Sequence, residues 1–117
     1  MACRDGHKEV VKILLDQDID VNTKDVSGWT PLLSACNGGH YDVVKLILDH
    51  PISNKIDFNV KAPEDYLSYT AFMYACRLGS VDIVDSFLKH SARIDFNCTN
   101  YFGQTAFMLA KMNAKLK

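Results

Sequence analysis

The feature that most constrains the fold is an internal repeat. Three segments share the order Ala-Cys, two variable residues, Gly, a short gap, an acidic residue and an apolar run: "ACRDGHKEVVKILL", "ACNGGHYDVVKLIL" and "ACRLGSVDIVDSFL". A threonine that opens a unit recurs at Thr30, Thr70 and Thr105, with spacings of 40 and 35 residues. Repeats of this length predict a solenoid, in which stacked units bury each other's apolar faces and extra residues are confined to loops.

Each repeat is expected to form two helices joined by a tight turn. Thr30 can cap a helix whose first residue is Pro31. Gly39 can end that helix, because glycine readily adopts the left-handed conformation found at helix ends. A second helix is expected from about residue 41 to residue 49, where apolar residues recur at helical spacing. The pattern therefore predicts an all-α chain of repeated helix-turn-helix units.

These motifs resemble those of the ankyrin repeat family over nearly the whole chain. The family's unit reads approximately D-x-x-G-x-T-P-L-H-x-A-A-x-x-G-H-x-E-V-V-x-x-L-L, followed by a D-V-N-like exit. Its most faithful copy here consists of Asp25, Gly28, Thr30, Pro31, Leu32, Ala35, Gly39, His40, Asp42, Val43, Val44, Leu46 and Leu48. The resemblance implies an ankyrin-repeat solenoid with projecting β-turn or hairpin loops, made of about two full repeats with a partial repeat at each end.

The chain departs from the family pattern at positions that affect the first helix of a unit. Ser68 stands where the family has Gly, and Ala71 stands where it has Pro. The family's usual histidine is replaced by Leu33, Met73 and Met108. We therefore expect the side-chain hydrogen bond of that histidine to be absent and the first helices to be held by apolar packing.

We expect a single ankyrin-repeat domain over residues 1–117. Its parts are a partial repeat over 1–24, a repeat over 25–61, a repeat over 65–99 and a partial C-terminal repeat over 100–117. The extended connection 51–64 is lengthened in two places, by four residues before Asn59 and by three after it. Pro51 is expected to end the preceding helix near His50. The extension either enlarges a binding edge or is a tolerated surface insertion.

Composition and charge exclude several classes of function. The 13 basic and 14 acidic side chains give a formal net charge of −1, which offers no electrostatic argument for nucleic acid or an anionic membrane. No apolar run approaches the roughly 20 residues of a membrane span, and the first residues lack the pattern of a signal peptide. Four cysteines with no close pair indicate reduced thiols. We therefore expect an intracellular, cytoplasmic protein.

No group of residues in the sequence points to chemistry. The cysteine spacing does not suit a zinc site, and Cys36 and Cys76 follow alanine inside apolar patterns, which is typical of core positions. His7 and His40 are expected to order the turn between helices. The glycines of "NGGH" are not followed by the Lys-Ser/Thr of a phosphate loop. We expect no catalytic residue, no metal ligand and no cofactor, so an enzyme is a distant third among the function classes.

The resemblance implies binding of another protein through the turn tips and the inner faces of the first helices. The candidate tip residues are Trp29, Tyr66, Leu67, Tyr69, Tyr101, Phe102 and Gln104. The candidate helix residues are Arg4, Asn37, Arg77 and Leu78. Five of the tip side chains are aromatic, and Trp and Tyr dominate binding hot spots. Two readings stay open: the rings face a partner, or they fold back onto neighbouring repeats in a purely structural segment with no partner of its own.

Two further expectations concern modification and self-association. In this family the exit asparagine can be hydroxylated, and Asn22 best fits the usual context. The chain begins and ends inside a repeat, which favours a fragment of a longer array. Apolar repeat ends without polar caps are expected to associate between molecules.

Overall fold

A computed structural model describes residues 8–17 and 19–116, with side chains described as far as Met112. The α-helices of this part of the chain are α1 (Lys8–Leu15), α2 (Pro31–Asn37), α3 (Tyr41–Asp49), α4 (Ala71–Leu78), α5 (Val81–Leu88) and α6 (Ala106–Leu116). Three 3-10 turns lie between them: η1 (Pro51–Lys55), η2 (Glu64–Tyr66) and η3 (Ser91–Arg93). Between Lys61 and Thr70 there is an isolated antiparallel bridge. The all-α fold class is confirmed, and the second helix over residues 41–49 is confirmed with it.

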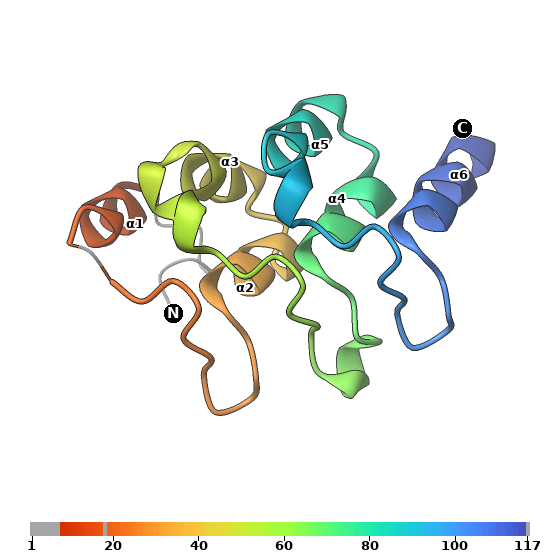
Figure 1. Cartoon of the computed structure of the whole chain (residues 1–117), viewed down its shortest axis with the longest axis horizontal. Coiled ribbons are helices and arrows are strands. Elements are labelled where there is room, and N and C mark those ends of the chain that lie inside the picture. Colours follow the sequence, from red (N-terminus) through yellow and green to blue (C-terminus); the bar gives the residue numbers. More distant parts are fainter. Residues whose placement is uncertain (1–7, 18, 117) are drawn as a thin grey trace. The chain divides into compact units, whose positions relative to one another are not determined.

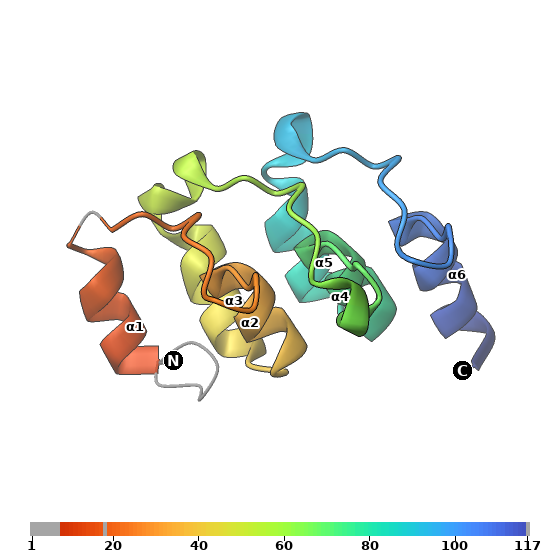
Figure 2. The same cartoon turned by 90° about the horizontal axis from the view of Figure 1, so that it is seen from below.

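The chain divides into two compact units, Met1–Asp57 and Phe58–Lys117. In the first unit α2 pairs with α3, and α1 packs beside α3 (Figures 1 and 2). In the second unit α4 pairs with α5 and also packs extensively against α6. The single-domain organisation and its repeat boundaries remain predictions.

Hydroxyl caps mark the starts of α2, α4 and α5. The Thr30 and Thr70 Oγ1 atoms accept hydrogen bonds from the backbone N–H groups three residues later, at 3.3 and 3.2 Å. Ser80 caps α5 in the same way, at 3.4 Å. Each cap satisfies one of the N–H groups that a helix start leaves without a partner. The caps predicted from the repeated threonine are therefore confirmed.

Met73 differs from its expected behaviour. The Thr70 N–H donates to the Met73 Sδ at 3.5 Å, while the Met73 N–H donates to the Thr70 hydroxyl. Sulfur is a weak acceptor, yet it occupies the place of the side-chain hydrogen bond that we expected to be absent. That expectation is wrong for Met73, because its flexible thioether can curl back over the first turn of α4.

Aromatic packing builds much of the core of the second unit. Phe72 on α4 and Phe87 on α5 make an edge-to-face contact, with ring centroids 5.7 Å apart. Phe58 also contacts Phe87, at 6.2 Å. The core of the first unit is mainly aliphatic instead, with Val43, Val44, Ile47 and Leu48 of α3 buried. In both units the apolar stripe at helical spacing is the buried face.

Asn22 and Asn59 occupy the same position in the connections that follow two repeats, and each forms hydrogen bonds to the backbone of the next such connection. The Asn22 Nδ2 donates to the Lys55 carbonyl, and its Oδ1 accepts from the Asp57 N–H, both at 2.8 Å. Asn59 makes the equivalent pair with the Arg93 carbonyl at 3.2 Å and the Asp95 N–H at 2.8 Å. One amide side chain thus pairs with a backbone donor and acceptor about one repeat away, which keeps the repeats in register.

The extended connection is built from two short turns. Helix α3 ends at Asp49, and Pro51 begins η1, so the expected helix end near His50 is confirmed. The Nδ1 atom of His50 accepts the Ile52 N–H at 3.0 Å and thereby caps η1. The second insertion forms η2. Asn59 lies between the two turns and keeps its bonding pattern, which explains how the extra residues leave the register intact.

Candidate protein-binding surface

The turn tips at residues 25–29 and 100–104 are built the same way. Asp25 Oδ1 accepts the Ser27 and Trp29 N–H groups, at 2.9 and 3.0 Å. In the second unit, Asn100 Oδ1 accepts from Phe102 and Gln104 at 2.9 and 3.0 Å. One short side chain therefore closes each loop from within. Gly28 and Gly103 take the left-handed position that both loops require.

The tip at residues 62–69 is longer and closes differently. Its ends pair through the Ala62 N–H and the Tyr69 carbonyl, at 2.7 Å. Leu67 and Ser68 have positive φ angles of 67° and 55°. A left-handed conformation is costly for residues with a Cβ, so this tip is strained. The tip is joined to its neighbour in the same unit, because the Tyr101 N–H donates to the Leu67 carbonyl at 2.9 Å.

Two candidate aromatics are buried. Trp29 is 2% exposed and Tyr69 is 5% exposed, which decides between the two readings left open for these rings. Both residues directly precede a capping threonine, where the chain returns to its helix. The Tyr69 ring accordingly lies against Tyr74 of α4, 5.0 Å between centroids, with the Arg77 guanidinium 5.7 Å from its centre. The reading in which these rings fold back applies here.

The other candidate aromatics of the second unit reach solvent. Tyr101 is 64% and Phe102 63% exposed, and their rings make an edge-to-face pair at 5.5 Å. Tyr66 is also exposed. Tyr101 and Phe102 therefore form an exposed aromatic pair in the edge-to-face geometry that aromatic rings prefer.

The remaining candidates are more scattered. Arg77 and Leu78 are exposed at the end of α4, whereas Leu67 and Gln104 are half-buried. Asn37, in the first unit, is half-buried at the end of α2. Arg4 lies outside the described residues. Asn22 is half-buried, and its role as a modification site stays a prediction.

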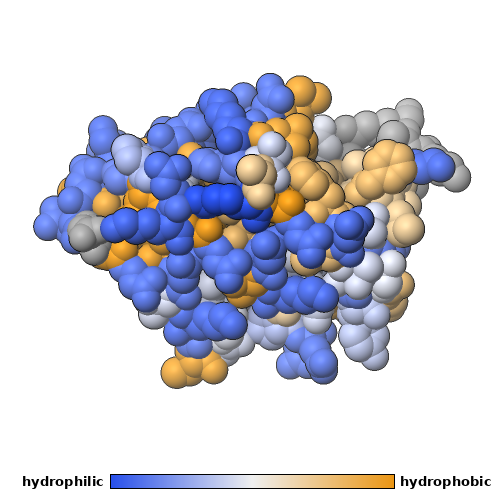
Figure 3. Space-filling view, viewed as in Figure 1, coloured by the Kyte–Doolittle hydropathy of each residue, from blue (hydrophilic) through white to orange (hydrophobic). Residues whose placement is uncertain are grey.

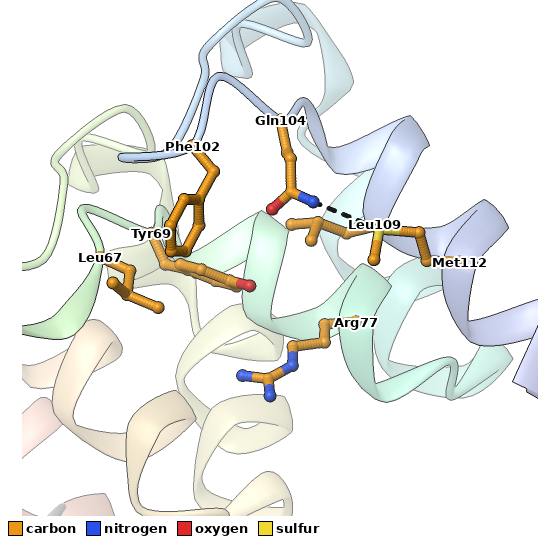
Figure 4. Close-up of a pocket in the computed structure, with 7 residues that line it drawn as sticks. All are labelled: Leu67, Tyr69, Arg77, Phe102, Gln104, Leu109 and Met112. Carbon is orange, nitrogen blue, oxygen red and sulfur yellow. Dashed lines mark hydrogen bonds between the residues drawn. The ribbon is translucent and has the colours of Figure 1, made fainter.

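The second unit has a groove of about 420 Å³ between its tips and helices (Figure 4). The lining residues are Leu67, Tyr69, Arg77, Phe102, Gln104, Leu109 and Met112. Five of them are candidates from the sequence. Leu109 and Met112 were missed, although their three-residue spacing on the predicted last helix places them on one face. The groove is apolar apart from one guanidinium, one amide and one phenol group.

Hydrogen bonds fix the amide in this groove. The Asn100 Nδ2 donates to the Gln104 Oε1 at 3.0 Å, and the Gln104 Nε2 donates to the Met112 Sδ at 3.3 Å. Because the amide oxygen is held by Asn100, the amide nitrogen is turned toward Met112, which also lines the groove (Figure 4). Gln104 therefore presents a donor to the groove.

The cysteines of the described part are not activated for chemistry. Burial raises the pKa of the Cys36 thiol well above its usual range and raises that of Cys76 to about 11. The pKa of Cys98 is also raised, by burial and then by the charge of Asp95. A thiol is nucleophilic only as thiolate, so all three are poor nucleophiles at neutral pH.

The described residues contain neither a group placed to bind a metal ion nor a helix suited to span a membrane. No group of three or more His, Cys, Asp or Glu side chains is placed to hold a metal ion. In the same part of the chain, no helix is both long enough and apolar enough to cross a membrane.

Comparison with known families gives two matches. A model of ankyrin repeats in three copies matches residues 1–62, which is more than half of the chain. The chain belongs to the ankyrin repeat family. A second ankyrin repeat model matches residues 67–96. Ankyrin repeats are generally protein–protein interaction modules and are typically non-enzymatic. No curated protein matches the chain.

Proposed function

We propose that the chain is a non-enzymatic module that binds another protein through the ankyrin tips and first-helix side of its second unit. The observation that carries the proposal is the exposed pair Tyr101 and Phe102 beside an apolar groove. Aromatic side chains bury much area at low entropic cost, which suits them as binding anchors. Such anchors are most effective when they lie next to a pocket that excludes water.

The hydrogen bonds of the tips favour the same surface as the binding surface. The Tyr101–Leu67 backbone hydrogen bond joins two tips of the unit into one edge, and Asn100 holds the loop that carries the aromatic pair. A pre-organised surface loses less entropy on binding than a flexible one. Tyr66, exposed on the adjoining tip, extends the apolar area.

The test is a double substitution with a matched control. Tyr101→Ala with Phe102→Ala should release bound partners and weaken binding by at least about 2 kcal/mol, because it removes two anchors. Val26→Ala is the control, since Val26 is a fully exposed apolar tip residue of the first unit. Partners captured by the wild-type chain should be retained by the control and lost by the double variant. Equal capture by both variants would contradict the proposal.

A second candidate is a purely structural segment that packs against further repeats or against another copy. The supporting observation is the exposure of apolar side chains on α6, where Phe107 is 75% exposed and Met108 is also exposed. Apolar colouring appears on the side of the view where α6 lies (Figure 3). This reading expects a mass that rises with concentration in light scattering and falls again in Phe107→Ser. A constant monomer mass at high concentration would contradict self-association.

A further inference from the structure

The groove of the second unit combines apolar walls with a single charged side chain. Leu67, Phe102, Leu109 and Met112 supply apolar surface from two tips and from α6. Phe102 and Tyr69 come close together at one side, and Arg77 extends from α4 beneath Tyr69 (Figure 4). A cavity of this size accommodates one or two large side chains of a bound segment.

Arg77 has no acidic partner within the described part of the chain. Its guanidinium lies 5.7 Å from the centre of the Tyr69 ring, and the described residues give it no ion pair. Stacking on an aromatic face leaves the edge of a guanidinium open, and that edge is where its N–H donors accept a carboxylate. The Arg77 guanidinium is therefore a candidate partner for an acidic group.

Two further donors face the groove. The Gln104 amide nitrogen uses one hydrogen for the Met112 sulfur and has a second one to donate. The Tyr69 hydroxyl has no hydrogen-bond partner among the described residues. The Arg77 guanidinium and the second Gln104 amide hydrogen can only donate, and the Tyr69 hydroxyl can donate or accept, which suits a ligand with acceptor groups.

The charges of the second unit determine which side of the groove favours an acidic ligand group. The unit holds seven basic and five acidic residues, a net charge of +2, whereas the first unit has a net charge of −3. Two of its acidic residues, Glu64 and Asp65, are exposed on the tip that carries Leu67, and Arg77 stands on the helix. An acidic ligand group is accordingly favoured at the helix side of the groove and disfavoured near that tip.

We propose that this groove binds an extended peptide segment in which a large apolar side chain enters between Phe102 and Leu109 and a nearby Asp or Glu carboxylate pairs with Arg77. The inference rests on the proposed function and names the chemistry of the partner. A phosphate is less well matched, because phosphate sites use clusters of cations and this groove has one. A carboxylate needs only the one guanidinium fork.

The test uses isotope-labelled full chain and small capped peptides, with binding followed by NMR. The probes are acetyl-Phe-Gly-Asp-amide and acetyl-Phe-Gly-Asn-amide, together with versions that have zero or two glycines. We expect the Asp peptide of the best spacing to shift the Arg77 Nε–H and Gln104 side-chain amide signals saturably. Its dissociation constant should be at least about 5-fold lower than that of the Asn peptide, because charge-assisted hydrogen bonds are the stronger ones.

Two arginine variants test whether the charge of Arg77 causes the preference for the Asp peptide. Arg77→Gln should abolish the preference for Asp and leave the weaker binding of both peptides. Arg93→Gln is the matched control, since Arg93 also lies over an aromatic ring, 4.9 Å from the centre of Phe58, but does not line the groove. This control should keep the full preference. Circular dichroism verifies that both variants remain helical.

The outcomes separate this inference from the proposed function. Equal binding of the Asp and Asn peptides, no saturable shift with any probe, or a preference that survives Arg77→Gln would each overturn the inference. Partner capture that still depends on Tyr101 and Phe102 would then leave the proposed function standing. A phosphoserine peptide in place of Asp that binds more tightly than every Asp peptide would also overturn it in favour of a phosphate ligand.

Discussion

The turn tips at residues 25–29 and 62–69 occupy the same place in two repeats and are held in different ways. In the first, one carboxylate accepts two backbone N–H groups and Gly28 takes the left-handed position. In the second, three extra residues form η2, and no hydrogen bond is made by the Asp65 side chain within the described part. Leu67 and Ser68 adopt the left-handed conformation there without glycine.

The two tips differ in the conformation of their backbone and in the side chains that they present. The first tip is conformationally relaxed and presents Val26 and Ser27, whereas the second is strained and presents Tyr66 and Leu67. Backbone strain persists only where surrounding structure holds it, and it is concentrated at functional sites. The strained tip is the one that borders the groove. The comparison therefore supports the second unit as the binding unit.

The largest expected effect tests a feature that both tips share, namely a buried aromatic residue directly before the capping threonine. Trp29→Ala should lower the free energy of unfolding by about 3–5 kcal/mol, because it removes a large side chain that is 2% exposed. Urea denaturation followed by circular dichroism measures the change. Val26→Ala, at the exposed tip, should change stability by less than about 0.5 kcal/mol. Similar small effects from both substitutions would mean that Trp29 is not a core residue.

Trp29 also illustrates how far the sequence predicts this fold. The repeated Thr and Gly predict caps and helix ends, because each of these residues acts on the backbone at a fixed place in the repeat. Pro51 predicts a helix end for the same reason. The direction of a tip side chain has no such local cause. It depends on tertiary packing, so the sequence leaves open whether Trp29 and Tyr69 face outward or fold back, and both are buried.

The groove was only partly predictable for a related reason. Tyr69, Arg77 and Phe102 could be found because they occupy family binding positions. Leu109 and Met112 join them only because α6 packs against α4, which is a contact that no sequence motif records. The loop closure by Asn100 could have been anticipated, since Asn100 stands at the repeat position of Asp25 and has the same short side chain with an accepting oxygen.

The second prediction tests the difference in how the tips are closed. Asp25→Ala should cost about 1–2 kcal/mol of stability, because two backbone N–H groups lose their acceptor. Asn100→Ala should cost a similar amount in the second unit. Asp65→Ala should change stability by less than about 0.5 kcal/mol. Urea titrations of the three variants check the order, and an equal loss in Asp65→Ala would remove the distinction between the tips.

The third prediction concerns the pH dependence of the free energy of unfolding that the buried Cys76 thiol causes. The pKa of Cys76 is raised to about 11 in the folded chain from 9.0, so its stability contribution is fully present below pH 9 and is lost as the pH rises toward 11. At pH 10 the loss should be up to about 1 kcal/mol, somewhat below the full linkage value, because Cys76 is less completely shielded from solvent than Cys36. The measurement is the stability difference between wild type and Cys76→Ala from pH 7 to pH 10.5. A difference that does not vary with pH would contradict the linkage.

The smallest expected effect addresses the strain itself. Ser68→Gly places a glycine at φ 55°, where the other tips already have Gly28 and Gly103, and should stabilise the chain by about 0.5 kcal/mol. The gain is small because glycine also raises the entropy of the unfolded chain. Gly28→Ala, at φ 94°, is the converse control and should destabilise by about 1 kcal/mol. Thermal denaturation resolves the two signs.

If the strain serves binding by holding Leu67 against the groove, Ser68→Gly should also weaken binding while it raises stability, because a relaxed tip is less pre-organised. A variant that is more stable and binds equally well would show that the strained tip is a tolerated insertion and not part of the binding edge.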